Sequence, residues 1–208
     1  RSNKRLVDME DFERAKDKIF MGAERKSMVI TEDEKRATAY HESGHAIVGC
    51  LLPGIDPVHK VTIIPRGRAL GLTWVLPEKD RISQYKKQML AQISFLFGGR
   101  IAEELFVHDI STGASNDFER ATQLARDMVT RFGMSDLGQV SFEAGNQEVF
   151  LGRDLMTRSD GSDATAARVD AAVRQIVQNC YAETVELVAA HRACMDRVVE
   201  VLIEKESL

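Results

Sequence analysis

Apolar residues recur every three or four positions along most of the chain, the spacing of helices that bury one face. The helices that this pattern predicts cover residues 9–21, 32–52, 83–97, 100–106, 117–132 and 162–190. A last predicted helix carries Met195, Val198, Val199 and Leu202. Gly98 and Gly99 are expected to separate the third helix from the fourth, because glycine weakens a helix interior.

One stretch departs from the helical spacing. Residues 58–76 are rich in β-branched and aromatic side chains around a Pro-Arg-Gly turn, which predicts two short strands at 58–64 and 70–76. Residues 134–161 contain four glycines and are expected to be irregular. The predicted fold class is therefore mainly α, with one small β element in the first half of the chain.

Composition narrows the class of protein. The chain has 208 residues, 44% of them hydrophobic and 29% charged, which is typical of a globular protein with one sizeable domain or two small ones. The net charge of −4 gives no reason to expect nucleic-acid binding. Cys50, Cys180 and Cys194 form no CxxC pair, and their apolar neighbours predict reduced core thiols rather than zinc ligands.

The stretch TAYHESGHAIVG, residues 38–49, contains the pattern H-E-x-x-H. On a helix, His41 and His45 lie on one face and can both reach a zinc ion at about 2.0–2.1 Å. Glu42 then points beside the metal, which suits a general base for a water activated by that metal. This pattern predicts a zinc-dependent hydrolase.

The alternative is a helix whose two histidines simply face solvent. Thr31 and Glu34 have the spacing of a capping box, so the motif lies well inside a capped helix. Gly44 costs such a helix about 1 kcal/mol relative to alanine, and a mid-helix glycine typically marks the close approach of another element. Both observations favour the metal site.

A catalytic zinc needs a third protein ligand. The extended pattern H-E-x-x-H-x-x-G-x-x-H fails, since Val48 and Leu51 occupy the positions of its glycine and third histidine. His59 and His108 remain as imidazole candidates, although a lone histidine is more often a surface or hydrogen-bonded residue.

Two acidic candidates are stronger. One is the pair Glu103 and Glu104, whose ordinary role would be solvated charge. The other is Asp117, which follows a loop of small residues at a predicted helix start and could equally be a helix cap. The residues alone do not decide between them.

Four stretches, HESGHAIVG, HKVTIIPRGRALGLT, GGRIAEEL and STGASNDFERAT, resemble the peptidase domain of the FtsH family of membrane-anchored AAA proteases. MGAERKSMVITEDEKRATAYHE is similar to the segment that joins the ATPase module of that family to its peptidase. The resemblance covers nearly the whole chain and is loosest after residue 155. It implies a helical zinc-peptidase domain over 31–208, preceded over 1–30 by the end of the ATPase lid helix and a linker.

The resemblance also implies roles for individual residues. His41 and His45 would bind one Zn²⁺ per chain, Asp117 would be the third ligand, and Glu42 would be the general base for a zinc-bound water that attacks the peptide carbonyl. Glu103 then becomes a candidate for a carboxylate that orients a ligating imidazole, and so does its neighbour Glu104.

The stretch ALGLT resembles the edge strand that lies beside the active site in this family. Gly71, Leu72 and Thr73 are therefore expected to bind an extended substrate through main-chain hydrogen bonds. The alternative is an ordinary hairpin strand with no role in binding.

The implied protein is a zinc metalloendopeptidase that degrades unfolded or misassembled membrane and soluble proteins. It would act as a homo-hexamer at the cytoplasmic face of the bacterial inner membrane, attached through segments upstream of this sequence. ATP would serve the full-length protein through its ATPase module. This chain contains no G-x-x-x-x-G-K-[ST] pattern and is not expected to bind ATP through a P-loop.

Two other functions compete with this one. The chain could serve mainly as an assembly module that sets the hexamer, since its C-terminal helices are long and amphipathic. It could also be another metal-dependent hydrolase, such as a deformylase, although no cysteine stands where a cysteine ligand would be expected.

Overall fold

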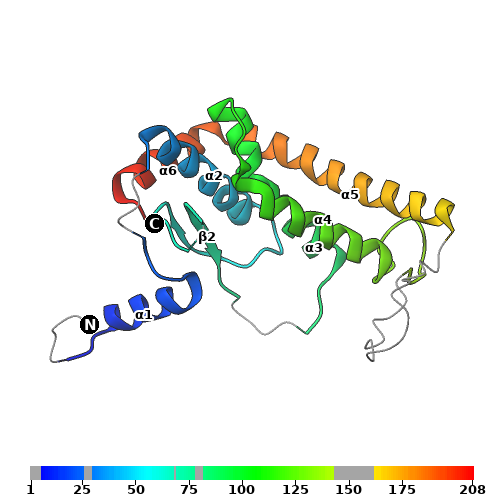
Figure 1. Cartoon of the computed structure of the whole chain (residues 1–208), viewed down its shortest axis with the longest axis horizontal. Helices are drawn as coiled ribbons and strands as arrows, with labels where there is room; N and C mark the ends of the chain where they lie inside the picture. Colours follow the sequence, from blue (N-terminus) through cyan, green and yellow to red (C-terminus); the bar gives the residue numbers. More distant parts are fainter. Residues whose placement is uncertain (1–5, 26–29, 68, 78–81, 143–161) are drawn as a thin grey trace, which may run out of the picture.

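The computed structural model describes residues 6–25, 30–67, 69–77, 82–142 and 162–208 (Figure 1). Its helices are α1 (Met9–Met21), α2 (Glu32–Leu51), α3 (Lys86–Ala102), α4 (Ser115–Thr130), α5 (Asp163–Ala190) and α6 (Arg192–Lys205). The strands are β1 (Val58–Thr62) and β2 (Leu72–Val75), and two short helical turns are η1 (Glu103–Val107) and η2 (Thr112–Ala114). The mainly α fold with one small β element is confirmed.

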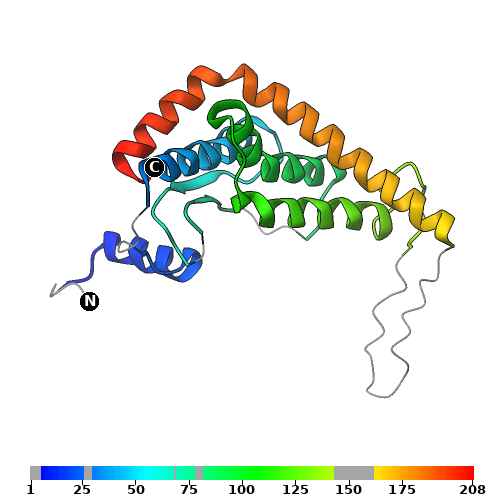
Figure 2. The ribbon, with the colours of Figure 1, turned by 45° about the horizontal axis from the view of Figure 1, so that its top comes forward.

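The core lies between α2, α3 and α4 and the two C-terminal helices. Figure 2 shows α5 and α6 as a long arch over the other three. Ile93, Phe97 and Ile101 of α3 are fully buried at the centre of this core. None of the helices in the described ranges is long and apolar enough to cross a membrane.

The predicted break at Gly98 and Gly99 is wrong, because α3 continues through both glycines to Ala102. A Cβ atom added to Gly44 of α2 would lie only 2.2 Å from the carbonyl oxygen of Gly98. The backbones of α2 and α3 therefore touch at this point. These glycines are needed for helix contact and do not end the helix.

Other differences lie at the ends of elements. α3 begins at Lys86 rather than residue 83, α4 begins at Ser115 rather than residue 117, and both strands are shorter than predicted. Most of the segment predicted to be irregular, residues 143–161, lies outside the described residues.

The three cysteines are free, but only one of them is a core thiol. Cys180 is buried, whereas Cys50 and Cys194 are exposed. The prediction was wrong for these two because apolar neighbours in the sequence lie on other faces of a helix.

The sheet is an antiparallel hairpin in which Val61 pairs with Thr73 and Thr62 with Leu72. The other edge of β1 is covered by the end of the chain: the Val61 N–H donates to the Leu208 carbonyl at 3.0 Å, and the reverse bond is 2.8 Å long. The edge of β2 that faces away from β1, here called its outer edge, pairs with no other strand of the described sheet.

The N-terminal helix is attached to this hairpin. Phe20 of α1 stacks on Trp74 of β2 with ring centroids 5.4 Å apart. Asp17 of α1 is buried and accepts a hydrogen bond from Lys60 of β1. These contacts attach α1 to both strands of the hairpin.

Candidate metal centre

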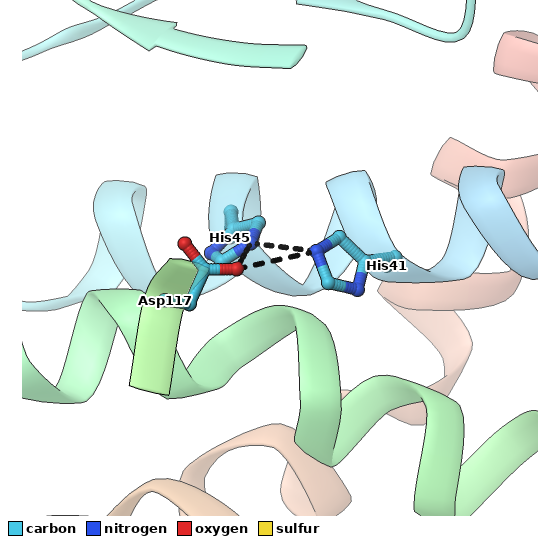
Figure 3. Close-up of side chains that lie close together, drawn as sticks. All are labelled: His41, His45 and Asp117. Carbon is cyan, nitrogen blue, oxygen red and sulfur yellow. Dashed lines mark hydrogen bonds and ion pairs between the residues drawn. The ribbon is translucent and has the colours of Figure 1, made fainter. Parts of the chain in front are cut away.

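Three side chains from α2 and α4 lie close together (Figure 3). His41 and His45 project from one face of α2, and their Nε2 atoms are 3.1 Å apart. Oδ2 of Asp117, in the first turn of α4, lies 3.6 Å from Nε2 of His41 and 3.5 Å from Nε2 of His45. The structure thus brings together both motif histidines and one of the two acidic candidates.

This triangle of donor atoms fits a tetrahedral zinc ion. Ligands at about 2.0–2.1 Å from a tetrahedral ion are separated from one another by about 3.3–3.4 Å. The three observed separations, 3.1, 3.5 and 3.6 Å, bracket that value. Two imidazole nitrogens and a carboxylate oxygen are also a donor set that zinc prefers.

The other nitrogen of each ring has a hydrogen-bond acceptor. Nδ1 of His41 donates to Oε1 of Glu103 at 2.8 Å, and Nδ1 of His45 donates to the Phe95 carbonyl at 2.7 Å. Since both partners only accept, each Nδ1 carries the proton and a neutral ring keeps its Nε2 lone pair for a cation. Partners of this kind typically fix the orientation of a metal-binding imidazole.

The segment that follows α3 positions Glu103 and Asp117 beside His41. η1 is a π-helical turn over Glu103–Val107, and the next residue, His108, has a φ of 60° that turns the chain. Ser111 then donates to Glu103 twice, through its N–H and its hydroxyl, each at 2.9 Å. The Ser111 hydroxyl also caps η2, after which α4 begins and presents Asp117.

A glycine leaves room for the two imidazoles. A Cβ atom added to Gly99 would lie 2.5 Å from Nε2 of His41 and 2.6 Å from Nε2 of His45. Contacts below 3.0 Å are essentially never formed by real Cβ atoms. α3 therefore forms the floor of the site, and only glycine fits at this position.

Glu42 is buried and lies between α2 and β2. Its Oε2 is 2.7 Å from the hydroxyl of Thr73, which donates to it. A Cβ atom on Gly71 would lie 2.7 Å from Oε1 of Glu42, so the residue before β2 also needs to be glycine. Burial raises the pKa of Glu42, against the opposing effect of His45 and His41.

The charges at the site favour a cation. Although burial acts to lower the pKa of His41, its hydrogen bonds with Asp117 and Glu103 raise that pKa to about 10. Burial acts to raise the pKa of Asp117, but its interactions with the two histidines hold it below its usual range. Glu103 behaves in the same way, since its bonds to His41 and Ser111 outweigh burial and lower its pKa.

The remaining candidates from the sequence lie elsewhere. Glu104 is exposed and accepts a hydrogen bond from the Tyr181 hydroxyl at 2.6 Å. His59 contacts Lys16 and the edge of the Trp74 ring, and His108 is exposed at the end of η1.

Several residues at the site were not predicted. The Phe95 carbonyl carries no signal in the sequence, because any residue has one. Ser111 and Gly99 could have been suspected as a turn former and a small residue, but not connected to the histidines. The contact of the Thr73 hydroxyl with Glu42 was also not predicted, since Thr73 was expected only to pair with substrate through its main chain.

Comparison of the sequence with known proteins places the chain in a family. The sequence profile of peptidase family M41 matches residues 28–208. An ATP-dependent zinc metalloprotease FtsH from Myxococcus xanthus is 55% identical over the whole chain, and one from Cupriavidus metallidurans is also 55% identical. The chain spans 33% and 32% of the length of these two relatives. The match over residues 28–208, together with identity at this level, shows that the chain belongs to peptidase family M41.

Proposed function

We propose that this chain is the proteolytic part of a zinc metalloendopeptidase, with His41, His45 and Asp117 as the ligands of one Zn²⁺. When bound, zinc would polarise the carbonyl of the scissile peptide and lower the pKa of a water molecule. Glu103 and the Phe95 carbonyl would keep the two imidazoles in place. The observation that carries the proposal is the triangle of three donor atoms, with sides of 3.1 to 3.6 Å.

Glu42 would act as the general base. Its carboxylate takes a proton from the attacking water at an Oε atom and then delivers it to the leaving nitrogen as the C–N bond breaks. Burial supports both steps, because it raises the pKa of Glu42 toward neutral pH. A carboxyl group with such a pKa can both accept a proton and release it. The hydroxyl of Thr73 would hold the carboxylate in position.

The substrate would be an extended polypeptide paired with the outer edge of β2, along Gly71, Leu72 and Thr73. Two features support this binding mode. The outer edge of β2 pairs with no other strand of the described sheet, and the Thr73 hydroxyl donates to Glu42. Main-chain pairing makes little demand on the substrate's side chains, as expected for degradation of unfolded or misassembled proteins.

In this proposal, ATP binding and membrane attachment belong to other parts of the full-length protein. Since the chain spans about a third of its relatives, which are named ATP-dependent, we assign ATP binding to an ATPase module outside it. The resemblance further implies a homo-hexamer attached to the cytoplasmic face of the bacterial inner membrane.

Cleavage of an unfolded protein tests this function. The zinc-loaded chain is incubated with casein without ATP, beside its Glu42→Gln and Glu104→Gln forms. We expect the unmodified chain and the Glu104→Gln control to cut, and Glu42→Gln to lose nearly all cleavage while keeping zinc. Chelation should stop cleavage by the active forms. Equal cleavage by Glu42→Gln would contradict the assigned base.

A further inference from the structure

Arg100 lies in the last turn of α3, directly after Gly99. Its side chain is only 12% exposed. A guanidinium group keeps its positive charge in a protein, so an arginine that is this well covered needs acceptors or negative charge beside it. The contacts of Arg100 lead to two residues that support the metal centre, Glu103 and Ser111.

The charge of Arg100 faces Glu103, three residues further along the chain. Residues at this spacing lie on one face of a helix, and here the pair spans the junction of α3 with η1. Nε of Arg100 lies 3.7 Å from Oε2 of Glu103 and has no hydrogen-bond partner among the described residues. The two side chains therefore attract each other through charge. Glu103 is only 3% exposed, and a buried carboxylate is costly without opposite charge nearby.

A second contact of Arg100 holds the segment on the other side of Glu103. Nη2 of Arg100 donates to the Ser111 carbonyl at 2.6 Å. The same serine donates to Glu103 through its N–H and its hydroxyl, each at 2.9 Å. Arg100, Ser111 and Glu103 thus form a closed ring of polar contacts. Oε1 of Glu103, within this ring, also accepts from Nδ1 of His41 at 2.8 Å.

An aromatic ring restricts the guanidinium group. The guanidinium carbon of Arg100 lies 5.1 Å from the ring centroid of Phe118, within the range of a cation–π contact. Phe118 follows Asp117 in α4 and packs against the buried ring of Phe97, with the two centroids 5.7 Å apart. The core therefore limits the positions that the guanidinium group can take.

We infer that Arg100 is a positioning residue of the metal centre, which holds the Glu103 carboxylate in the orientation that fixes the His41 imidazole. It acts through Glu103 and not on the metal donors themselves. The inference rests on the proposed function in one respect, since the fixed imidazole would serve zinc binding. Lysine would be a poorer residue here, because an ammonium group lacks the planar fork that reaches Ser111 and Glu103 together.

Proton exchange at His41 tests the inference without any metal. In the metal-free chain with isotope-labelled histidine, the Nδ1–H of His41 is protected from exchange with water by Glu103, and that of His45 by the Phe95 carbonyl. Both exchange rates are measured by NMR. Arg100→Met removes the charge and the donors but keeps a side chain of similar shape. We expect it to speed exchange at His41 about tenfold or more, as for a weakened hydrogen bond, and to leave His45 unchanged.

Arg66→Met is the matched control. Arg66 is also a buried arginine that binds one backbone carbonyl and one glutamate, since it donates to the Gly22 carbonyl at 3.0 Å and to Glu24 at 2.7 Å. These partners are not residues of the metal centre, so both exchange rates should stay unchanged. Thermal unfolding shows whether each variant is folded. If Arg100→Met is not, Arg100→Lys replaces it, and faster exchange at His41 is again expected.

Zinc affinity then tests whether Arg100 acts through Glu103. The unmodified chain, Arg100→Met, Glu103→Gln and the double variant are titrated with zinc. Arg100→Met should bind zinc about tenfold more weakly than the unmodified chain, as expected when the support of a ligand is lost. In the Glu103→Gln background the same change should cost less than about threefold, because the group through which Arg100 acts is already altered.

Three results would overturn the inference. These are unchanged exchange at His41 in the folded Arg100 variant, equal acceleration in Arg66→Met, and the same loss of zinc affinity with and without Glu103→Gln. Faster exchange at His41 in the Arg100 variant of a chain that binds no zinc would uphold the inference and contradict only the proposed function.

Discussion

Replacing Gly99 by alanine gives a prediction in which local and tertiary effects have opposite signs. Gly99 lies inside α3, where alanine favours the helix by about 1 kcal/mol. If only helix propensity mattered, Gly99→Ala would stabilise the protein. The new methyl group, however, would lie 2.5 Å from Nε2 of His41 and 2.6 Å from Nε2 of His45.

The size of the effect follows from these contacts. Both distances are below the 3.0 Å limit of real Cβ contacts, so His41 must retreat by about 0.5 Å and His45 by about 0.4 Å unless α3 itself shifts. Metal sites require ligand distances within about 0.2 Å of ideal values. We therefore expect zinc affinity to fall at least as far as it does when a partner that orients a ligand is lost, about 10–100-fold.

Gly98→Ala is the matched control. A Cβ atom on Gly98 would lie 2.7 Å from the Gly44 carbonyl oxygen and would press on the backbone of α2 rather than on the imidazoles. It should lower the free energy of unfolding, since overpacking costs about 1–3 kcal/mol, with a smaller loss of zinc affinity than Gly99→Ala.

The assay is a zinc titration in competition with a coloured chelator, with thermal unfolding of the metal-free forms measured in parallel. Gly99→Ala should show the larger loss of zinc affinity, and Gly98→Ala the larger loss of stability. Wild-type zinc affinity in a folded Gly99→Ala protein would refute the idea that α3 forms the floor of the site.

Three further predictions concern other residues of the site and one residue of the core. Glu103→Gln should lower zinc affinity about 10–100-fold in the same titration, because it weakens the acceptor that orients His41, whereas Glu104→Gln should leave the affinity unchanged. Thr73→Val should lower kcat for casein without changing zinc content, and Thr73→Ser should restore it; an equal loss in both would contradict a positioning role for the hydroxyl. Burial raises the pKa of Cys180 to about 11, so at pH 8 this thiol stays protonated and Ellman's reagent should label only the two exposed cysteines until the chain is unfolded; three fast thiols in the native protein would contradict the burial.

Features that depend on neighbouring residues in the sequence could be predicted. Thr31 and Glu34 form the expected capping box at the start of α2, with the Glu34 N–H 3.2 Å from the Thr31 hydroxyl. The helical position of the two histidines follows from that start and from their spacing. Local hydrogen bonds and helical periodicity were sufficient for this part of the site.

Features that depend on packing between distant segments could not be predicted. Judged by helix propensity alone, Gly98 and Gly99 weaken α3. The need for glycine appears only in the folded structure, where Gly98 contacts Gly44 of α2. The choice between Asp117 and Glu103 as the residue facing Nε2 of His41 also depends on the path of η1 and η2, so the residue pattern alone left it open and only the family resemblance pointed to Asp117. In the structure both carboxylates contact His41, one at each ring nitrogen.

Asp117 is proposed to complete a zinc site with the two histidines, and the zinc affinity of the Asp117→Ala form decides whether it does. The unmodified chain, Asp117→Ala and the control Glu104→Ala are titrated with zinc against the same chelator. We expect one tightly bound zinc ion in the unmodified chain and in Glu104→Ala, and at least about 100-fold weaker binding in Asp117→Ala. Unchanged affinity in Asp117→Ala, or a loss confined to Glu104→Ala, would contradict this proposal.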